Sequence, residues 1–309
     1  MDPRPPALPS PLAGEGAGEG FRVLCLLALA VFVCLPATGC RKQAAGTAAP
    51  AGPRVVSLAP NLTEIVCAIG AADLLVGRTS ACNYPPAVVT NVPVVGGFGT
   101  PSLETLLAAQ PTLILEVDLE DEALGRRLDE LGLARKRIAC RALDDIPKAI
   151  REVGECVNRR AEAARLAGGI ESRLADLRRN AAANPSPVSV YAEIWDNPLM
   201  TAGKKSFVAE LIRLAGGRNV GDEADGEYFT VSYEWVVSKN PDVVLCLATP
   251  DAPARENVLK RPGWEAIRAV REGKVYDRFP LDVLTRPGPR VLDGIEELRS
   301  RIAGTRPKP

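Results

Sequence analysis

The sequence contains no histidine, and this absence excludes several kinds of chemistry. Ser-His-Asp and Cys-His catalysis, HExxH zinc sites and haem held by histidine all require an imidazole. No GxSxG motif and no paired-carboxylate motif stands out either. We therefore expect a protein that is not an enzyme and that holds no resident metal or cofactor.

Net charge and aromatic residues are also scarce. The 38 Lys and Arg residues balance 38 Asp and Glu residues, and aromatic residues make up 5% of the chain. Nucleic-acid-binding proteins carry an excess of basic residues, so the balance argues against nucleic acid as a partner. The balance does not exclude binding of a small neutral or zwitterionic ligand. Each aromatic residue in a loop is then a candidate contact for such a ligand.

The amino-terminal segment is predicted to be a targeting signal. Residues 1–20 are rich in Pro, Gly and Ala, and an apolar run of thirteen residues follows at 23–35. That run is too short to span a bilayer and is typical of a signal peptide. We assign residues 1–39 to a signal peptide with an atypical leading extension.

The end of this segment, Pro36-Ala37-Thr38-Gly39-Cys40, resembles the lipobox of bacterial lipoproteins. The resemblance implies that Cys40 is lipidated and that residues 40–53 form a flexible tether. The alternative is an ordinary signal peptide in which Cys40 has no such role. Five cysteines follow Cys40, and an odd set allows two disulfides at most in an oxidising compartment. Spacing leaves the pairing open among Cys67, Cys82, Cys140, Cys156 and Cys246.

Strands and helices alternate from residue 54 onward, which predicts an α/β fold. With 309 residues, 46% of them hydrophobic, the chain is long enough for two domains. We expect strands at 54–58, 112–115 and 136–139 in an amino-terminal α/β lobe over 54–144. We also expect a helix that begins with Asn61 as its cap and Glu64 three residues on.

A linking helix is predicted over 145–184, because apolar residues recur at helical spacing and no strand pattern interrupts them. The pair Gly168-Gly169 weakens the expectation of one rigid helix. A carboxy-terminal α/β lobe over 185–309 then begins with a strand at 188–191.

The two predicted lobes share a repeated pattern at an offset of 130 residues. Residues 101–116 read PSLETLLAAQPTLILE and residues 231–246 read VSYEWVVSKNPDVVLC. Each stretch has a Ser cap, a Glu in the first helical turn, a short helix, a Pro and a buried strand. Capping rules reproduce such strings by chance, but the shared order favours two similar lobes.

These motifs resemble the class III substrate-binding proteins of bacterial ABC importers, and among them most closely the cobalamin-binding members. The resemblance covers residues 54–303, and its most specific pieces are residues 57–64 (SLAPNLTE), 82–86 (CNYPP), 101–104 (PSLE) and 197–204 (NPLMTAGK). It implies two Rossmann-like lobes joined by one long α-helix. It also implies a cleft between the lobes in which a corrinoid is bound without being transformed.

The resemblance implies a set of ligand contacts on both lobes. A corrinoid is large and flat-faced, and aromatic rings with few charges suit such a ligand. The implied contacts are Tyr84, Pro85, Phe98, Trp195, Asp196, Asn197, Tyr228 and Arg286. We expect Trp195, Asp196 and Asn197 to follow the strand at 188–191. Each aromatic residue has the alternative of packing into a core or under a loop.

The resemblance also implies partners and a location. Glu104 and Glu234 match the glutamates with which each lobe docks onto the permease of the importer, although a Glu in a first helical turn is also favourable for the helix alone. The chain is then a monomeric receptor in the cell envelope, on the periplasmic side, held to a membrane by its lipid. The alternative ligand is an iron-siderophore, whose anionic groups Arg286 and Arg290 would meet, or haem held through a Tyr.

Overall fold

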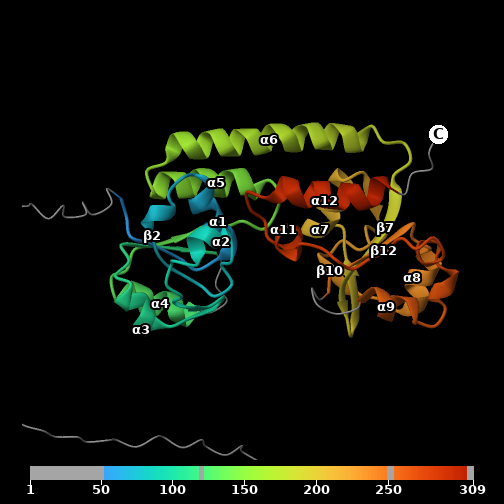
Figure 1. The fold of residues 1–309 in the computed structure, drawn as a ribbon, viewed down its shortest axis with the longest axis horizontal. Helices are drawn as coiled ribbons and strands as arrows, with labels where there is room; N and C mark the ends of the chain where they lie inside the picture. Colours follow the sequence, from blue (N-terminus) through green and yellow to red (C-terminus); the bar gives the residue numbers. More distant parts are fainter. Residues whose placement is uncertain (1–51, 118–121, 249–253, 305–309) are drawn as a thin grey trace, which may run out of the picture. The chain divides into compact units, whose positions relative to one another are not determined.

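The computed structural model describes residues 52–117, 122–248 and 254–304, and these form two α/β lobes (Figure 1). The signal peptide, Cys40 and most of the tether predicted from the sequence lie outside the described residues. None of the helices in those three ranges is long and apolar enough to cross a membrane.

Lobe 1 is built on a parallel sheet. Its strands are β1 (Val55–Ser57), β2 (Leu75–Arg78), β5 (Leu113–Glu116) and β6 (Arg135–Arg137), in the order β2-β1-β5-β6. The three strands expected from the sequence therefore exist, displaced by one or two residues. The other elements of lobe 1 are α1 (Pro60–Ala68), a 3₁₀ helix (Ala72–Leu74), α2 (Pro86–Val89), β3 (Gly96–Gly97), β4 (Thr100–Pro101), α3 (Leu103–Ala108) and α4 (Glu122–Glu130).

Lobe 2 has the same parallel sheet with an antiparallel extension. Strands β7 (Val188–Asp196), β9 (Gly217–Asn219), β11 (Val243–Cys246) and β12 (Val275–Tyr276) run parallel, with β9 and β11 on β7 and β12 on β11. Strand β8 (Leu199–Ala202) pairs antiparallel with the far end of β7, and β10 (Tyr228–Thr230) pairs antiparallel with β8. The helices are α7 (Phe207–Leu214), α8 (Tyr233–Lys239), α9 (Ala254–Leu259), a 3₁₀ helix (Trp264–Ala266), α10 (Arg268–Arg271), α11 (Leu281–Thr285) and α12 (Val291–Ala303).

The repeat seen in the sequence is a repeat of structure. Helices α3 and α8 begin 130 residues apart, and β5 and β11 have the same offset at both ends. In each lobe a proline comes shortly before the second strand of the repeat. The residue before that proline has a positive φ in both lobes, 47° at Gln110 and 43° at Asn240. Ser102 and Ser232 cap the two helices by accepting a backbone N–H three residues on. The two sheets thus share one strand–helix–strand plan.

The segment expected as a single linking helix over 145–184 consists of two helices. Helix α5 (Asp145–Cys156) ends before Asn158, which has a φ of 57°, and α6 (Arg160–Ala182) follows. The chain folds back there, and α6 packs on α5. Gly154 permits the contact, because a Cβ at this position would lie 2.3 Å from the Cβ of Ala163. Helix α6 runs unbroken through Gly168-Gly169, so the glycine pair does not interrupt it.

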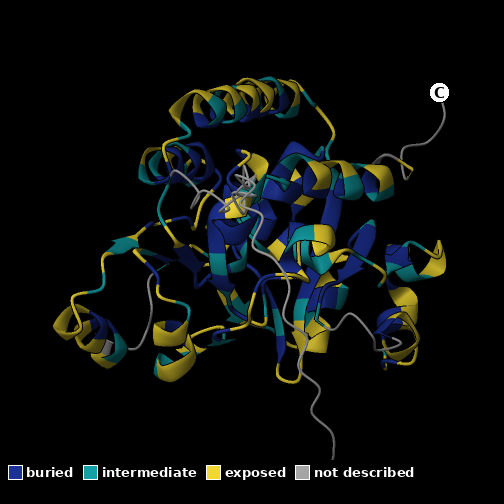
Figure 2. Cartoon of the chain, turned by 60° about the vertical axis from the view of Figure 1, so that its left-hand side comes forward, coloured by how far each residue is buried: buried dark blue, intermediate teal, exposed yellow. Residues whose placement is uncertain are grey.

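Helix α6 connects the two lobes. Its 23 residues span about 35 Å at 1.5 Å per residue. One stripe is buried and packs on α5 at the end of lobe 1 and on α7 in lobe 2. The opposite face is exposed (Figure 2). The buried stripe consists of Ala163, Ala167, Ile170, Leu174 and Leu177.

Candidate functional site

A pocket of about 390 Å³ is lined by residues of both lobes. Lobe 1 contributes Phe98 and lobe 2 contributes Arg286, two of the contacts predicted from the sequence. The other lining residues are Pro60, Asn61, Ala81, Val117, Ala139, Cys140, Arg141, Thr285 and Pro287. The wall is mostly apolar, with two arginines among its lining residues, which suits a large ligand with polar groups on its rim.

Phe98 is presented at the tip of the β3–β4 hairpin, where its side chain is 55% exposed. Gly96 makes this turn possible, since its φ is 131° and a Cβ there would lie 2.6 Å from the Cα of Pro101. A large apolar ring held in the open at a pocket wall has little reason to be there for folding alone. It is available to cover the face of a ligand.

Arg286 follows α11 and bonds to lobe 1 as well as to its own lobe. Its guanidinium lies 2.6 Å from Asp282 Oδ1 and donates to Asn83 Oδ1 at 2.7 Å. The Nδ2 of Asn83 donates in turn to Asp282 Oδ2 at 2.8 Å. The planar guanidinium is therefore held in place before a ligand arrives.

Tyr84 and Pro85 lie in the loop before α2, and neither lines the 390 Å³ pocket. The Tyr84 ring is 41% exposed, and the guanidinium carbon of Arg290 lies 3.8 Å from its centroid. The peptide bond between Tyr84 and Pro85 is cis. Tyr84 is thus a surface aromatic residue with one face already occupied by a cation.

Asn61 and Glu64 do not form the helix cap that the sequence predicted. Helix α1 begins at Pro60, and Ala59 occupies the cap position without a side-chain bond. Asn61 Nδ2 donates to the Pro287 carbonyl at 3.1 Å, and Glu64 pairs with Arg290. Both side chains therefore bond to residues of lobe 2 instead of capping α1.

The predicted residues of lobe 2 lie on the antiparallel extension. Strand β7 continues to Asp196, so Trp195 and Asp196 lie within the strand and not after it, and Asn197 begins the turn to β8. Trp195 is paired with Met200, which is paired with Thr230. Paired residues share a face and residues two apart share it again, so Trp195 and Tyr228 lie on one face of the extension.

Both aromatic residues of the extension are accessible, Trp195 at 49% and Tyr228 at 42%. The Trp195 indole N–H donates to the Asn197 carbonyl at 2.8 Å, which orients the ring. Burial, followed by the charge of Glu227, raises the pKa of Tyr228, so its hydroxyl stays protonated and able to donate. Neither ring lines the pocket of Phe98 and Arg286, and neither is part of a core.

A buried ion pair that sequence reasoning missed supports this strand. Glu193, two residues before Trp195, is 1% exposed. Its two carboxylate oxygens accept from the two terminal nitrogens of Arg261 at 2.5 and 2.9 Å. The guanidinium carbon lies 4.6 Å from the Trp264 ring centroid. Breaking such a pair leaves an uncompensated buried charge, so the contact opposes displacement of β7 at Glu193.

The two predicted docking glutamates occupy matching positions. Glu104 and Glu234 are each the second residue of their helix, α3 and α8, and both side chains are exposed. A hydrogen bond from Ser232 lowers the pKa of Glu234, so this carboxylate is charged at neutral pH.

All five cysteines between residues 52 and 304 are free thiols, so none of the disulfides that the sequence allowed is present there. Within the described ranges no three of the Cys, Asp and Glu side chains gather in a group that could hold a metal ion.

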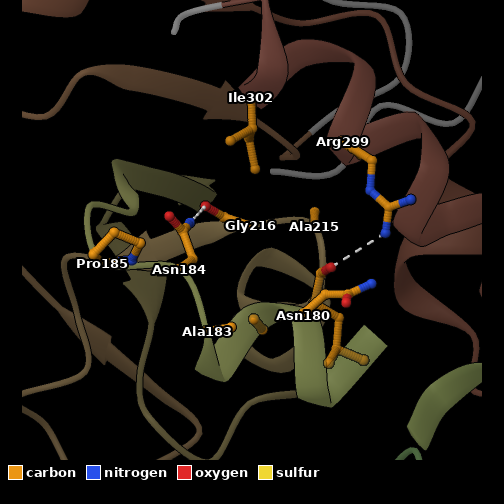
Figure 3. Close-up of a pocket in the computed structure, with 10 residues that line it drawn as sticks. Asn180, Ala183, Asn184, Pro185, Ala215, Gly216, Arg299 and Ile302 are labelled. Carbon is orange, nitrogen blue, oxygen red and sulfur yellow. Dashed lines mark hydrogen bonds between the residues drawn. The ribbon is translucent and has the colours of Figure 1, made fainter. Parts of the chain in front are cut away.

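A second pocket, of about 410 Å³, lies where the ends of α6 and α7 meet α12 (Figure 3). Asn184 Nδ2 donates to the Gly216 carbonyl at 3.1 Å, and Arg299 donates to the Leu214 carbonyl at 3.5 Å. These bonds satisfy carbonyls at the end of α7, which is a structural role. None of the predicted site residues lines this pocket.

Comparisons with known proteins match this chain to periplasmic substrate-binding proteins. Residues 55–278 match the family described as periplasmic binding protein. An uncharacterized ABC transporter substrate-binding lipoprotein of Bacillus subtilis strain 168, YvrC, is 30% identical over 256 residues, which cover 81% of this chain and 79% of that protein.

Two solved structures share the fold along nearly their whole length. The periplasmic vitamin B12-binding protein BtuF of Vibrio cholerae has a TM-score of 0.69 at 27% identity, covering 83% of this chain and 99% of that chain. The periplasmic heme-binding protein RhuT from Roseiflexus sp. RS-1 has a TM-score of 0.71 at 26% identity, covering 82% and 98%. The fold is therefore that of class III periplasmic binding proteins, and the two structures are named for different ligands.

Proposed function

The chain belongs to the family of periplasmic binding proteins, the non-enzymatic receptors of ABC importers, and on this premise we propose that its ligand is a corrinoid such as cobalamin. The observation that carries the proposal is the pocket shared by Phe98 and Arg286, with exposed aromatic rings on both lobes. The 27% identity to the vitamin B12-binding protein supports the same ligand.

In this proposal each lobe covers part of a flat ring. Phe98 and Tyr84, with Pro85 beside it, contact the ligand from lobe 1, and Trp195 and Tyr228 contact it from lobe 2. Aromatic rings suit this task because they bury large flat areas with few rotatable bonds. Arg286 would meet the phosphate of the corrinoid, and Asp196 and Asn197, where β7 turns into β8, would meet the amides at its rim.

We further propose that Cys40 carries a lipid that holds the receptor to a membrane on the periplasmic side of the cell envelope, with the remainder of residues 40–53 as the tether. The naming of the Bacillus relative as a lipoprotein supports this. Glu104 and Glu234 would dock the loaded receptor, as a monomer, onto the permease dimer of the importer.

The second candidate ligand is haem or an iron-siderophore. Two arginines, Arg141 and Arg286, line the pocket, and guanidinium groups pair well with carboxylates. The likeness to a heme-binding protein supports this alternative.

The full chain, purified in detergent, is to be titrated with cyanocobalamin, with hemin and with a ferric hydroxamate, each followed by its visible absorption. We expect saturable binding of cyanocobalamin in preference to the other two. Phe98→Ala should weaken that binding about tenfold, since it removes an exposed ring worth about 1–2 kcal/mol of contact. The matched control is Leu131→Ala, which removes another exposed apolar side chain of lobe 1. Preferential saturation by hemin or by the hydroxamate would contradict the corrinoid proposal.

A further inference from the structure

Lobe 2 holds the Tyr84 loop of lobe 1 at two successive residues. Asn83 bonds to Asp282 and to Arg286, at 2.8 and 2.7 Å, and the Tyr84 ring is stacked by Arg290. The three lobe 2 residues come from one stretch of nine residues, which begins at the second residue of α11 and ends at the residue before α12. We call residues 282–290 the clasp.

Arg290 makes the tightest contact of the clasp. Its guanidinium donates to both carboxylate oxygens of Glu64, at 2.8 and 2.6 Å, across 226 residues of sequence. Glu64 is 4% exposed and the Arg290 side chain 20% exposed, so water competes weakly for this pair. Two parallel bonds set the plane of the guanidinium as well as its position.

The guanidinium that Glu64 holds also lies over the Tyr84 ring. The guanidinium carbon lies 3.8 Å from the Tyr84 ring centroid, well within the range of a cation–π contact. One face of the ring is therefore covered, and the 41% of the residue that stays exposed is what a ligand can reach. A tyrosine held in this way loses little freedom when a ligand docks.

We propose that Arg290, oriented by Glu64, is a positioning residue that sets which face of Tyr84 meets the ligand. The proposal rests on the proposed function, in which Tyr84 contacts a corrinoid. It makes the ligand contact of lobe 1 dependent on a residue of lobe 2.

The clasp is also part of the pocket wall. Arg286 and Pro287 line the pocket, and Pro287 accepts from Asn61 at 3.1 Å and from the Cys140 thiol at 3.3 Å. A ligand in the pocket therefore touches the segment that orients Tyr84.

Lysine cannot replace Arg290 in this role. An ammonium group keeps the charge beside Glu64, but it has neither the fork that fixes a plane nor the flat face that stacks on a ring. Arg290→Lys thus removes the orientation while it leaves the buried carboxylate with a cation. Glu64→Gln is the complementary change. It weakens the two hydrogen bonds that orient the Arg290 guanidinium and leaves that guanidinium in place to contact Tyr84.

The test uses the full chain in detergent with cyanocobalamin as the probe. We expect Arg290→Lys and Glu64→Gln each to lower the affinity about tenfold, the size of a desolvated cation–π contact. In a Tyr84→Ala background, Arg290→Lys should cost no further affinity, since its effect passes through the ring. The matched control is Arg301→Lys. Like Arg290, Arg301 pairs with a glutamate and lies over a tyrosine ring, here Glu297 and Tyr276, and it lies outside the clasp. Losses that add in the double variant would overturn the proposal.

A second readout needs no ligand. The chain has five tyrosines, so 3-fluorotyrosine labelling gives a small set of ¹⁹F signals, and Tyr84→Phe identifies that of Tyr84. Arg290→Lys should shift the Tyr84 signal and Arg301→Lys should not. An unchanged Tyr84 signal in Arg290→Lys would overturn the proposal. Should the wild-type chain fail to bind cyanocobalamin, the proposed function fails, and the ¹⁹F signal alone then decides the role of Arg290.

Discussion

Cys140 is a lobe 1 residue whose thiol bonds to the lobe 2 backbone at Pro287. It is 7% exposed, and burial raises its pKa to about 12, with a hydrogen bond from Asn61 acting in the opposite direction. Thiolate is the reactive form, so at a pH near 8 this thiol is almost wholly in its unreactive protonated form.

We therefore expect iodoacetamide to leave Cys140 unmodified in the native chain and to alkylate it fully in urea, as read by peptide mass spectrometry. Rapid native alkylation of Cys140 at the same pH would contradict the closed contact between Cys140 and Pro287.

Single residues of the site were predictable where a loop aromatic or an arginine stood in a recognisable motif, as for Phe98 and Arg286. Asn61 and Glu64 were not, because their first-turn positions indicate a helix cap. Their partners, Pro287 and Arg290, lie 226 residues away, and no local rule connects such distant positions.

At the scale of elements, β7 and α10 are joined to the start of β11 through Asp242. Its carboxylate accepts from the Ser189 backbone and hydroxyl at 2.9 and 2.7 Å and from Arg268 at 2.5 Å. Burial opposes the charge, but these donors outweigh burial and lower the pKa of Asp242.

A lowered native pKa means that the unfolded chain binds the proton more tightly. The stabilisation from Asp242 is thus complete above the ordinary pKa of about 3.9 and is lost as the pH falls through the native value. Asp242→Asn should lower the free energy of unfolding at neutral pH by about 1–3 kcal/mol and flatten its decline below about pH 4. Urea titrations across that range measure both effects. Asp293→Asn, at an exposed position of α12, is the control, and an unaltered acid slope in Asp242→Asn would contradict the account.

Element type was more predictable than element length. Apolar runs indicated the parallel strands, but β7 continues five residues past Tyr191 because it gains an antiparallel partner in β8, which pairs in turn with β10. That pairing is a tertiary effect which alternation within one strand does not report. Likewise, helical spacing continued through the break at Asn158, where the chain reverses so that α6 packs on α5.

At the scale of the molecule, two copies of one α/β plan place Glu104 and Glu234 at equivalent positions of the two lobes. Exposed charges of this kind steer and orient a partner more than they add affinity. Replacing each with Arg should weaken association with the reconstituted permease about tenfold and leave cyanocobalamin binding unchanged.

Glu162→Arg is the control for this docking prediction, since Glu162 also lies in a first helical turn, on α6. Equal losses for all three variants would indicate an effect on helices and contradict docking through Glu104 and Glu234.

The central claim is that the pocket between the lobes, walled by Phe98 and Arg286, holds the corrinoid. A crystal structure of the full chain grown with cyanocobalamin, with diffraction recorded at the cobalt absorption edge, tests it most directly. We predict a single anomalous peak for cobalt beside Phe98 and Arg286. A peak in the pocket of Asn184 and Arg299, or no peak in crystals that contain the ligand, would contradict the account.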